Sequence, residues 1–181
     1  MNILCRVIML VVLVLGSTLG FAKTSEWQLS DAGMDYALTQ FGASYQVKGH
    51  SLIILIDQSI VLTHLDEQMR NGYYNSDYSK SYIVRRPLAY FTVSALNAST
   101  YIIPRVYQDH PSLNYLNVSV RIKYENVMGN DVTGSLLSFS MSRNLSNQIN
   151  WIRFMPANFG DVYPNIRFSN LTLREFYREK I

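Results

Sequence analysis

The chain has 181 residues, of which 48% are hydrophobic, and its net charge at pH 7 is +3. This length is typical of one domain, and the scattered charges do not form the basic stripe that a nucleic-acid-binding surface needs. The single cysteine excludes a disulfide framework and a cysteine-ligated zinc site.

The first segment of the chain has the pattern of a cleavable signal peptide. Arg6 precedes an unbroken apolar run at 7–15, and small residues follow up to Ala22, where we place the cut. A retained membrane anchor would need about 20 apolar residues, which is longer than this run. We therefore predict a signal peptide at 1–22 and a single soluble domain at 23–181.

The position of the single cysteine indicates the cellular compartment of the protein. Cys5 lies before the apolar run and is removed with the leader, so the exported domain has no thiol. Small secreted domains of eukaryotes usually rely on disulfides, and a thiol-free exported domain fits a bacterial periplasm better. Four Asn-x-Ser/Thr sequons leave eukaryotic secretion open; they begin at Asn97, Asn117, Asn144 and Asn170. We expect a periplasmic or extracellular protein with no membrane span after cleavage.

The first element of the exported domain is predicted to be a helix. Apolar side chains recur at helical spacing from Met34 to Tyr45. Ser30 or Asp31 can accept a backbone hydrogen bond as N-cap, and Gly42 is a suitable end.

A turn and a second helix follow. Residues 48–50 have turn composition, and 51–56 form a short apolar run that fits either a buried strand or the beginning of a helix. Residues 59–70 have one apolar and one charged side, which predicts an amphipathic helix. Asn71 and Gly72 tolerate positive φ and are expected to end it.

Strands are predicted for the middle of the chain. Residues 82–85, 88–95 and 101–106 are rich in β-branched and aromatic side chains. Pro87 separates the first two, and Pro104 makes the third an edge strand or a bulged one, because proline cannot donate a hydrogen bond to the ladder.

The clearest local pattern is a hairpin. Apolar and polar side chains alternate over residues 116–125, which predicts a strand with one buried and one solvated face. Turn residues follow at 129–131, and the same alternation returns at 137–142.

The remaining residues predict further strands. After a polar connection at 143–148, residues 149–154 have strand composition. The last strand contains Ile166 and Phe168 followed by Leu171 and Leu173. Its apolar side chains change phase, as a β-bulge near residues 169 and 170 would cause.

These elements predict the α+β class, with two N-terminal helices packed on one face of an antiparallel β-meander of about four to six strands. The helices are needed there because one face of the meander is apolar and has to be covered.

No set of residues predicts a reaction. His50, His64 and His110 have no metal-ligand spacing. The sequence contains no Gly-x-Ser-x-Gly elbow and no glycine-rich phosphate loop. We therefore expect no catalytic residue, no metal and no cofactor.

Tyrosine is the compositional exception, with 13 residues. Most occur where strand propensity explains them, but one group lies in a polar segment beside a pair of arginines. Exposed tyrosine and arginine are typical of interfaces. We predict partner binding by Tyr73, Tyr74, Tyr78, Tyr82, Arg85 and Arg86.

Three functions can be weighed. We favour an exported, non-enzymatic module that binds another envelope or secreted protein within an envelope or secretion assembly. The alternative is a periplasmic protein that binds a small apolar ligand in a pocket between helices and sheet. An enzyme is the third, which the lack of an acid, base or nucleophile set argues against. The sequence leaves the partner and the oligomeric state open.

Overall fold

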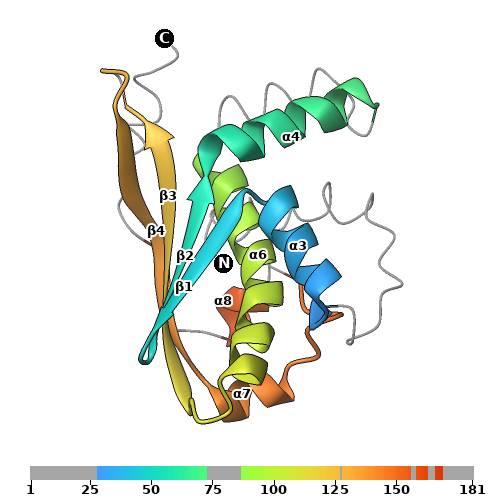
Figure 1. The fold of residues 1–181 in the computed structure, drawn as a ribbon, viewed down its shortest axis with the longest axis vertical. Helices are drawn as coiled ribbons and strands as arrows, with labels where there is room; N and C mark the ends of the chain where they lie inside the picture. Colours follow the sequence, from blue (N-terminus) through green and yellow to red (C-terminus); the bar gives the residue numbers. More distant parts are fainter. Residues whose placement is uncertain (1–27, 73–86, 127, 156–157, 163–165, 169–181) are drawn as a thin grey trace.

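The computed structural model describes residues 28–72, 87–126, 128–155, 158–162 and 166–168, which form an α+β fold around one mixed sheet (Figure 1). The helices are α3 (Asp31–Gln40), α4 (Gln58–Arg70), α6 (Pro87–Asp109), α7 (Arg143–Gln148) and α8 (Phe159–Val162). The strands are β1 (Ala43–Lys48), β2 (Ser51–Asp57), β3 (Tyr115–Glu125), β4 (Asp131–Ser142) and β5 (Arg167–Phe168).

The strands lie in the sheet in the order β1-β2-β3-β4-β5. β2 and β3 are parallel, whereas β1–β2, β3–β4 and β4–β5 are antiparallel. The prediction of a purely antiparallel meander is therefore wrong. A parallel pair needs a crossover that returns the chain to the same end of the sheet, and α4 and α6 both lie in that crossover.

Helix α6 occupies the residues for which strands were predicted at 88–95 and 101–106, and both of those predictions are wrong. From Tyr90 to Ile103, every side chain except that of Asn97 is buried. A helix buried on all sides has no polar face and shows no helical period in its sequence. The prediction that the two helices packed on the sheet are both N-terminal is also wrong, because the large central helix α6 comes from the middle of the chain.

Helix α3 begins at the predicted cap and ends, as predicted, just before Gly42. The Ser30 hydroxyl accepts a hydrogen bond from the amide of Gly33 at 3.1 Å, which confirms the N-cap. The helix ends at Gln40, and Gly42 has a φ of +55°. Tyr45, predicted on the helix face, lies in β1 instead. Because glycine adopts positive φ without strain, the chain can turn here directly into the sheet.

Residues 51–56, for which a strand and the beginning of a helix were both open, are a strand. Several other predictions are confirmed. The turn at 48–50 has Gly49 at a φ of +56°. The helix predicted at 59–70 is α4. The hairpin predicted at 116–142 is β3 and β4, and its inward side chains are buried as the alternation required.

The chain after β4 departs from the prediction. Residues 143–148 form α7, which the Ser142 hydroxyl caps by accepting from the Leu145 amide at 3.1 Å. The strand predicted at 149–154 is wrong. Residues 151–153 form a turn, and the Trp151 indole donates to the Ser146 carbonyl at 3.0 Å.

Some predictions concern residues that the structure does not describe. Of the last predicted strand, β5 contains Arg167 and Phe168, whereas Leu171 and Leu173 lie outside the described residues. The leader and the strand predicted at 82–85 lie outside them as well.

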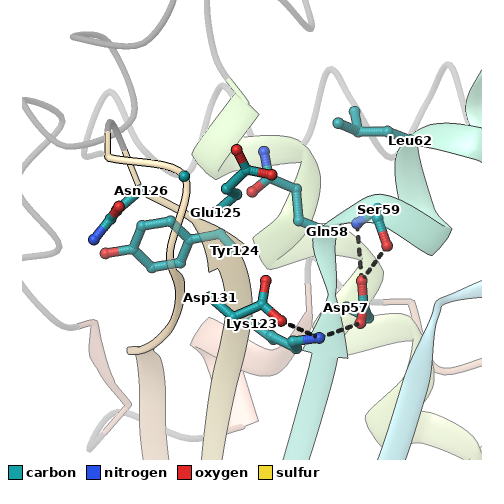
Figure 2. Close-up of a pocket in the computed structure, with 10 residues that line it drawn as sticks. Asp57, Gln58, Ser59, Leu62, Lys123, Tyr124, Glu125, Asn126 and Asp131 are labelled. Atoms are coloured by element: carbon teal, nitrogen blue, oxygen red, sulfur yellow. Dashed lines mark hydrogen bonds and ion pairs between the residues drawn. The ribbon is translucent and has the colours of Figure 1, made fainter.

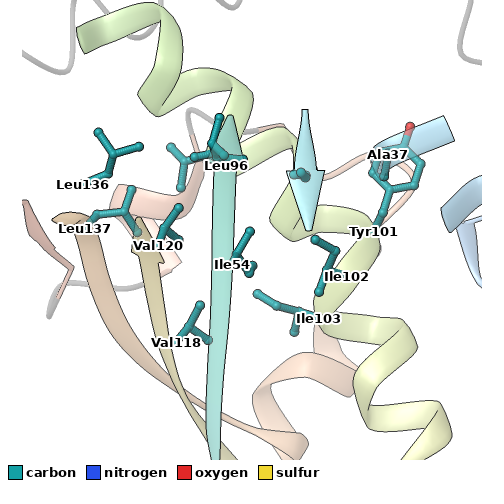
Figure 3. Close-up of a cluster of buried hydrophobic side chains, with 14 of the residues drawn as sticks. Ala37, Ile54, Leu96, Tyr101, Ile102, Ile103, Val118, Val120, Leu136 and Leu137 are labelled. Carbon is teal, nitrogen blue, oxygen red and sulfur yellow. The ribbon is translucent and has the colours of Figure 1, made fainter. Parts of the chain in front are cut away.

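The hydrophobic core lies between one face of the sheet, here called the inner face, and α6 (Figure 3). Ile54 of β2 and the alternate side chains of β3 meet Leu96, Ile102 and Ile103 of α6, all of them fully or almost fully buried. Helix α3 packs on α6, where the ring centroids of Tyr36 and Tyr101 lie 6.1 Å apart. Within the described ranges, none of the helices has the length and hydropathy required to cross a membrane.

Arg105 joins α3 to α6. Its guanidinium donates to the carboxylates of Asp31 and Asp109, at 2.8 and 2.9 Å, and to the carbonyl of Leu29 at 2.7 Å. The chain that leads into α3 is therefore held on the surface of α6 by two acceptors, the Leu29 carbonyl and the Asp31 carboxylate.

Arg143 holds the C-terminal end of α6. It donates to the carbonyls of Tyr107, His110 and Leu113 at 2.9, 2.6 and 2.7 Å. The Tyr107 hydroxyl donates to the carbonyl of Met141 at 2.6 Å. Burial raises the pKa of Tyr107 to about 12, despite the opposing charge of Arg143, so the hydroxyl remains a donor.

Gly42 provides a test of the junction between α3 and β1. A Cβ at Gly42 would lie 2.9 Å from the Asp57 carbonyl oxygen and 3.0 Å from Ile60 Cβ, whereas at Gly49 it would meet nothing within 4 Å. Both glycines have positive φ, so alanine at either should cost about 1–2 kcal/mol. We expect Gly42→Ala to cost about 1–3 kcal/mol more because of the overlap.

Urea unfolding of the two variants measures this difference, with Gly49→Ala as the matched control. Equal losses of unfolding free energy would contradict the close packing at Gly42.

Candidate functional site

Two charged side chains meet where the parallel strands end. Because β2 and β3 are parallel, their carboxyl ends lie at the same edge of the sheet, which is where open α/β sheets commonly bind ligands. Asp57 and Lys123 are partners in the register of these strands. Lys123 Nζ lies 3.8 Å from an Asp57 carboxylate oxygen and 2.8 Å from one of Asp131.

A pocket of about 580 Å³ lies at this edge, between the first turn of α4 and the end of the β3–β4 hairpin (Figure 2). Its lining is mostly polar or charged, and we call it the strand-end pocket. The lining residues are Asp57, Gln58, Ser59, Leu62, Lys123, Tyr124, Glu125, Asn126, Gly129 and Asp131.

Asp57 is fixed in place because it is also the N-cap of α4. One of its carboxylate oxygens accepts from the amide of Ser59 at 2.9 Å and from its hydroxyl at 2.6 Å. Partial burial raises the pKa of Asp57, but these hydrogen bonds and the charge of Lys123 outweigh burial and leave it below the usual value. The carboxylate therefore stays ionised near neutral pH.

Lys123 is held in its charged form as well. The hydrogen bond to Asp131 and the negative charge of that residue raise the pKa of Lys123. A general acid or base works best with a pKa near the working pH. Asp57 and Lys123 have pKa values moved away from neutrality, so this pair suits recognition of a charged or polar group better than proton transfer.

The hairpin beside the pocket has a defined turn. The Asn126 side-chain oxygen accepts from the amides of Met128 and Asn130 at 2.9 and 3.1 Å. Gly129 has a φ of +77°, which a residue with a side chain rarely adopts. This turn fixes the wall of the pocket that Glu125 and Asp131 provide.

The face of the sheet opposite the core, here called the outer face, is the second candidate. In register, one row across it contains Gln46, Ile53, Ser119, Ser138 and Arg167. These side chains are exposed or half-buried, whereas α3, α6 and α8 pack toward the inner face (Figure 1).

A second row runs beside the first and contains Ser44, Leu55, Arg121 and Ser135. The two aliphatic side chains of these rows, Ile53 and Leu55, are neighbours on β2. They are half-buried and do not belong to the core. Among the described residues, Arg121 and Arg167 have no acidic partner. The outer face thus has an aliphatic centre flanked by hydroxyls and two available cations.

The site residues predicted from the sequence lie outside the described residues, so their partner-binding role stays a prediction. They are Tyr73, Tyr74, Tyr78, Tyr82, Arg85 and Arg86.

The three histidines lie on different elements of the fold. His50 stacks on Tyr115 with ring centroids 4.2 Å apart, and His64 hydrogen-bonds Gln68 at 2.7 Å. His110 follows the end of α6. Across the described ranges, no three His, Cys, Asp or Glu side chains lie close enough to hold a metal ion.

The sequence did not predict either candidate surface, because both depend on the register between strands that are far apart in sequence. Asp57 and Lys123 are far apart in sequence, and only the parallel register of β2 and β3 brings them together. The turn composition at 129–131 was the one available signal for a wall of the pocket.

Comparison with known proteins found no relative of this chain. No known protein family, no curated protein and no solved structure matches this chain.

Substitutions at Asp57 test the electrostatics of the strand-end pocket. Asp57→Ala removes the N-cap of α4 and should lower the unfolding free energy by about 0.5–2 kcal/mol. Asp57→Asn is the matched control, because asparagine also caps helices and only the charge is lost.

The pH dependence follows from the lowered pKa of Asp57. Its ionised form stabilises the fold above the unfolded value of 3.8, and this contribution is lost as the pH falls through the folded value. We expect the unsubstituted protein to lose more stability than Asp57→Asn between neutral pH and about pH 3. Equal losses in urea unfolding at the two pH values would refute the assignment.

Proposed function

We propose that the protein is an exported, non-enzymatic interaction module that binds another envelope or secreted protein, in the periplasm of a bacterium. The outer face of the sheet is the observation that carries this proposal. Protein interfaces commonly have an apolar centre and a polar rim with arginine enriched, and the two rows around Ile53 and Leu55 have this arrangement.

The charges of the outer face indicate the chemistry of the partner. Arg121 lies beside Leu55 in one row, and Arg167 ends the other. Arginine binds carboxylates in a bidentate geometry. The partner we propose therefore presents acidic side chains around an aliphatic contact.

The strand-end pocket supports binding over catalysis. The Asp57–Lys123–Asp131 group places two carboxylates around one ammonium group, and the pKa shifts of Asp57 and Lys123 favour their charged forms. Such a group can orient a polar part of a partner without taking or giving a proton.

Binding of a small apolar ligand is the weaker candidate. Ligand sites of that kind are lined mainly by hydrophobic and aromatic side chains. The strand-end pocket has Leu62 as its only aliphatic side chain, so it does not favour this alternative.

Affinity capture with matched variants tests the proposal. We expect the double variant Ile53→Ser, Arg121→Glu to lose a protein that the unsubstituted chain captures from the native envelope fraction. Arg153→Glu, which makes the same charge change at an exposed site in the 151–153 turn, should retain it. Thermal unfolding of each variant checks that the fold is intact, and identical capture by all three proteins would refute the outer face as the interface.

The predicted tyrosine and arginine cluster is a second contact in this proposal. We expect substitution of Tyr73, Tyr74, Arg85 and Arg86 by alanine to weaken capture of the same partner. If every captured protein is retained by this variant, the cluster has no part in binding.

Export has a separate test. Mass spectrometry of the native protein from the envelope fraction should give a chain that begins at Lys23. An intact N-terminal methionine on protein isolated from the cytosol would contradict export and the choice of partner.

A further inference from the structure

Strand β1 lies at an edge of the sheet, and its pairing with β2 identifies the backbone groups that point outward. Across the described residues, β2 is the only strand beside β1 (Figure 1). The Asp57 amide donates to the Gly42 carbonyl at 2.7 Å, one step before the first pair of the register, Ala43–Ile56. Hydrogen-bonded and non-hydrogen-bonded pairs alternate along an antiparallel ladder. The even-numbered residues of β1 therefore bond to β2, and the N–H and C=O groups of the odd-numbered residues point away from it.

The odd-numbered residues of β1 are Ala43, Tyr45 and Val47. In the described part of the chain, no turn, loop or side chain supplies a hydrogen bond to any of the three. The Tyr45 side chain is exposed, and that of Val47 is half-buried. β1 thus has a row of unused backbone donors and acceptors along its outer edge, which is the arrangement to which another strand adds.

β1 has none of the features that usually prevent edge strands from pairing with other chains. Natural edge strands are commonly protected by a bulge, a proline or a charged side chain. The register of β1 with β2 runs over all six residues without a shift, and the strand contains no proline. Its one charged residue, Lys48, is the last residue of the strand, next to the turn. The rest of this edge is regular and uncharged.

We propose that β1 is the contact between two copies of this chain, which pair antiparallel about a two-fold axis at Tyr45. In this register Tyr45 lies opposite Tyr45 of the second copy, and Ala43 lies opposite Val47 of the second copy. These are the residues whose N–H and C=O groups point outward, so each finds its hydrogen bonds in the second copy. A two-fold contact of this kind is the commonest symmetry of homo-oligomers.

The side chains of β1 fit its own copy in this register. Tyr45 pairs with the core residue Ile54 and so belongs to the inner side, where an aromatic pair at the axis stabilises the contact. Lys48 falls opposite Gly42 of the second copy, so no like charges face each other. A shift by two residues in either direction would leave Ala43 or Val47 without a partner in β1. This match of β1 with itself favours a second copy over a strand of unrelated sequence.

The contact is independent of the partner proposed for the outer face. Because the two-fold axis is perpendicular to the sheet, the outer faces of both copies lie on the same side of one continuous sheet. Ile53, Leu55 and Arg121 therefore stay accessible in the dimer, and each dimer presents two such surfaces side by side. Two linked surfaces bind a multivalent partner more tightly than one surface does.

Analytical ultracentrifugation of the purified protein tests the second copy as the occupant of this edge. We expect a monomer–dimer equilibrium that shifts to the dimer as the concentration rises. Val47→Pro removes an outward N–H and no bond to β2, which edge strands tolerate, and should weaken association about tenfold or more. Val47→Thr is the matched control, because threonine keeps both the N–H and the β-branched shape, and it should associate like the unsubstituted protein.

A monomer at every concentration would overturn the proposal, and so would an edge occupied by a chain of different sequence. Equal association of Val47→Pro and Val47→Thr would show that another surface makes the dimer. Circular dichroism of both variants checks that the fold is intact.

Disulfide trapping tests the register. Directly opposite residues of an antiparallel pair lie about 4.5–5.5 Å apart at Cα, within the roughly 4.4–6.8 Å that a disulfide spans. With Cys5→Ser in the full chain, Tyr45→Cys supplies the only thiol, and we expect oxidation to give a covalent dimer that reductant reverses. In the control Gln46→Cys, the two thiols are on diagonal neighbours roughly 7–8 Å apart, so this variant should stay largely uncrosslinked. No crosslink at position 45, or equal crosslinking of both variants, would overturn the register.

Discussion

The parallel pairing of β2 and β3 is the constraint on which the rest of this fold depends. Neighbouring parallel strands require a long return path, and here that path contains α6, whose side chains from Tyr90 to Ile103 are almost all buried. The same pairing brings Asp57 and Lys123 to one edge and aligns the two rows of the outer face. The core, the strand-end pocket and the outer face are thus consequences of one strand register.

Local sequence patterns predicted the elements that have one solvent-exposed face and one buried face. The alternation of β3 and β4, the amphipathic α4 and the Ser30 cap were all readable, because each is determined by neighbours in sequence. Helix α6 was not readable in this way. Complete burial removes the periodic signal, and its aromatic and β-branched residues then resemble a strand.

The candidate surfaces were less predictable than the elements. Whether Arg121 lies beside Leu55 depends on the neighbour of each strand and on the direction in which that neighbour runs, and neither is encoded locally. The tyrosine and arginine cluster was visible only as composition. A site made by strand register can be recognised in a sequence only after the order and direction of the strands are known.

The contacts of Arg143 have a consequence for how this domain folds. Helix α6 has no basic residue in its last turn, and the cation beside its final carbonyls comes from the far end of the β3–β4 hairpin. A peptide with the α6 sequence would therefore lack the group that completes its own terminus. Helix α6 and the β3–β4 hairpin therefore stabilise each other as one cooperative unit, through the hydrogen bonds that the Arg143 guanidinium donates to the Tyr107 and His110 carbonyls.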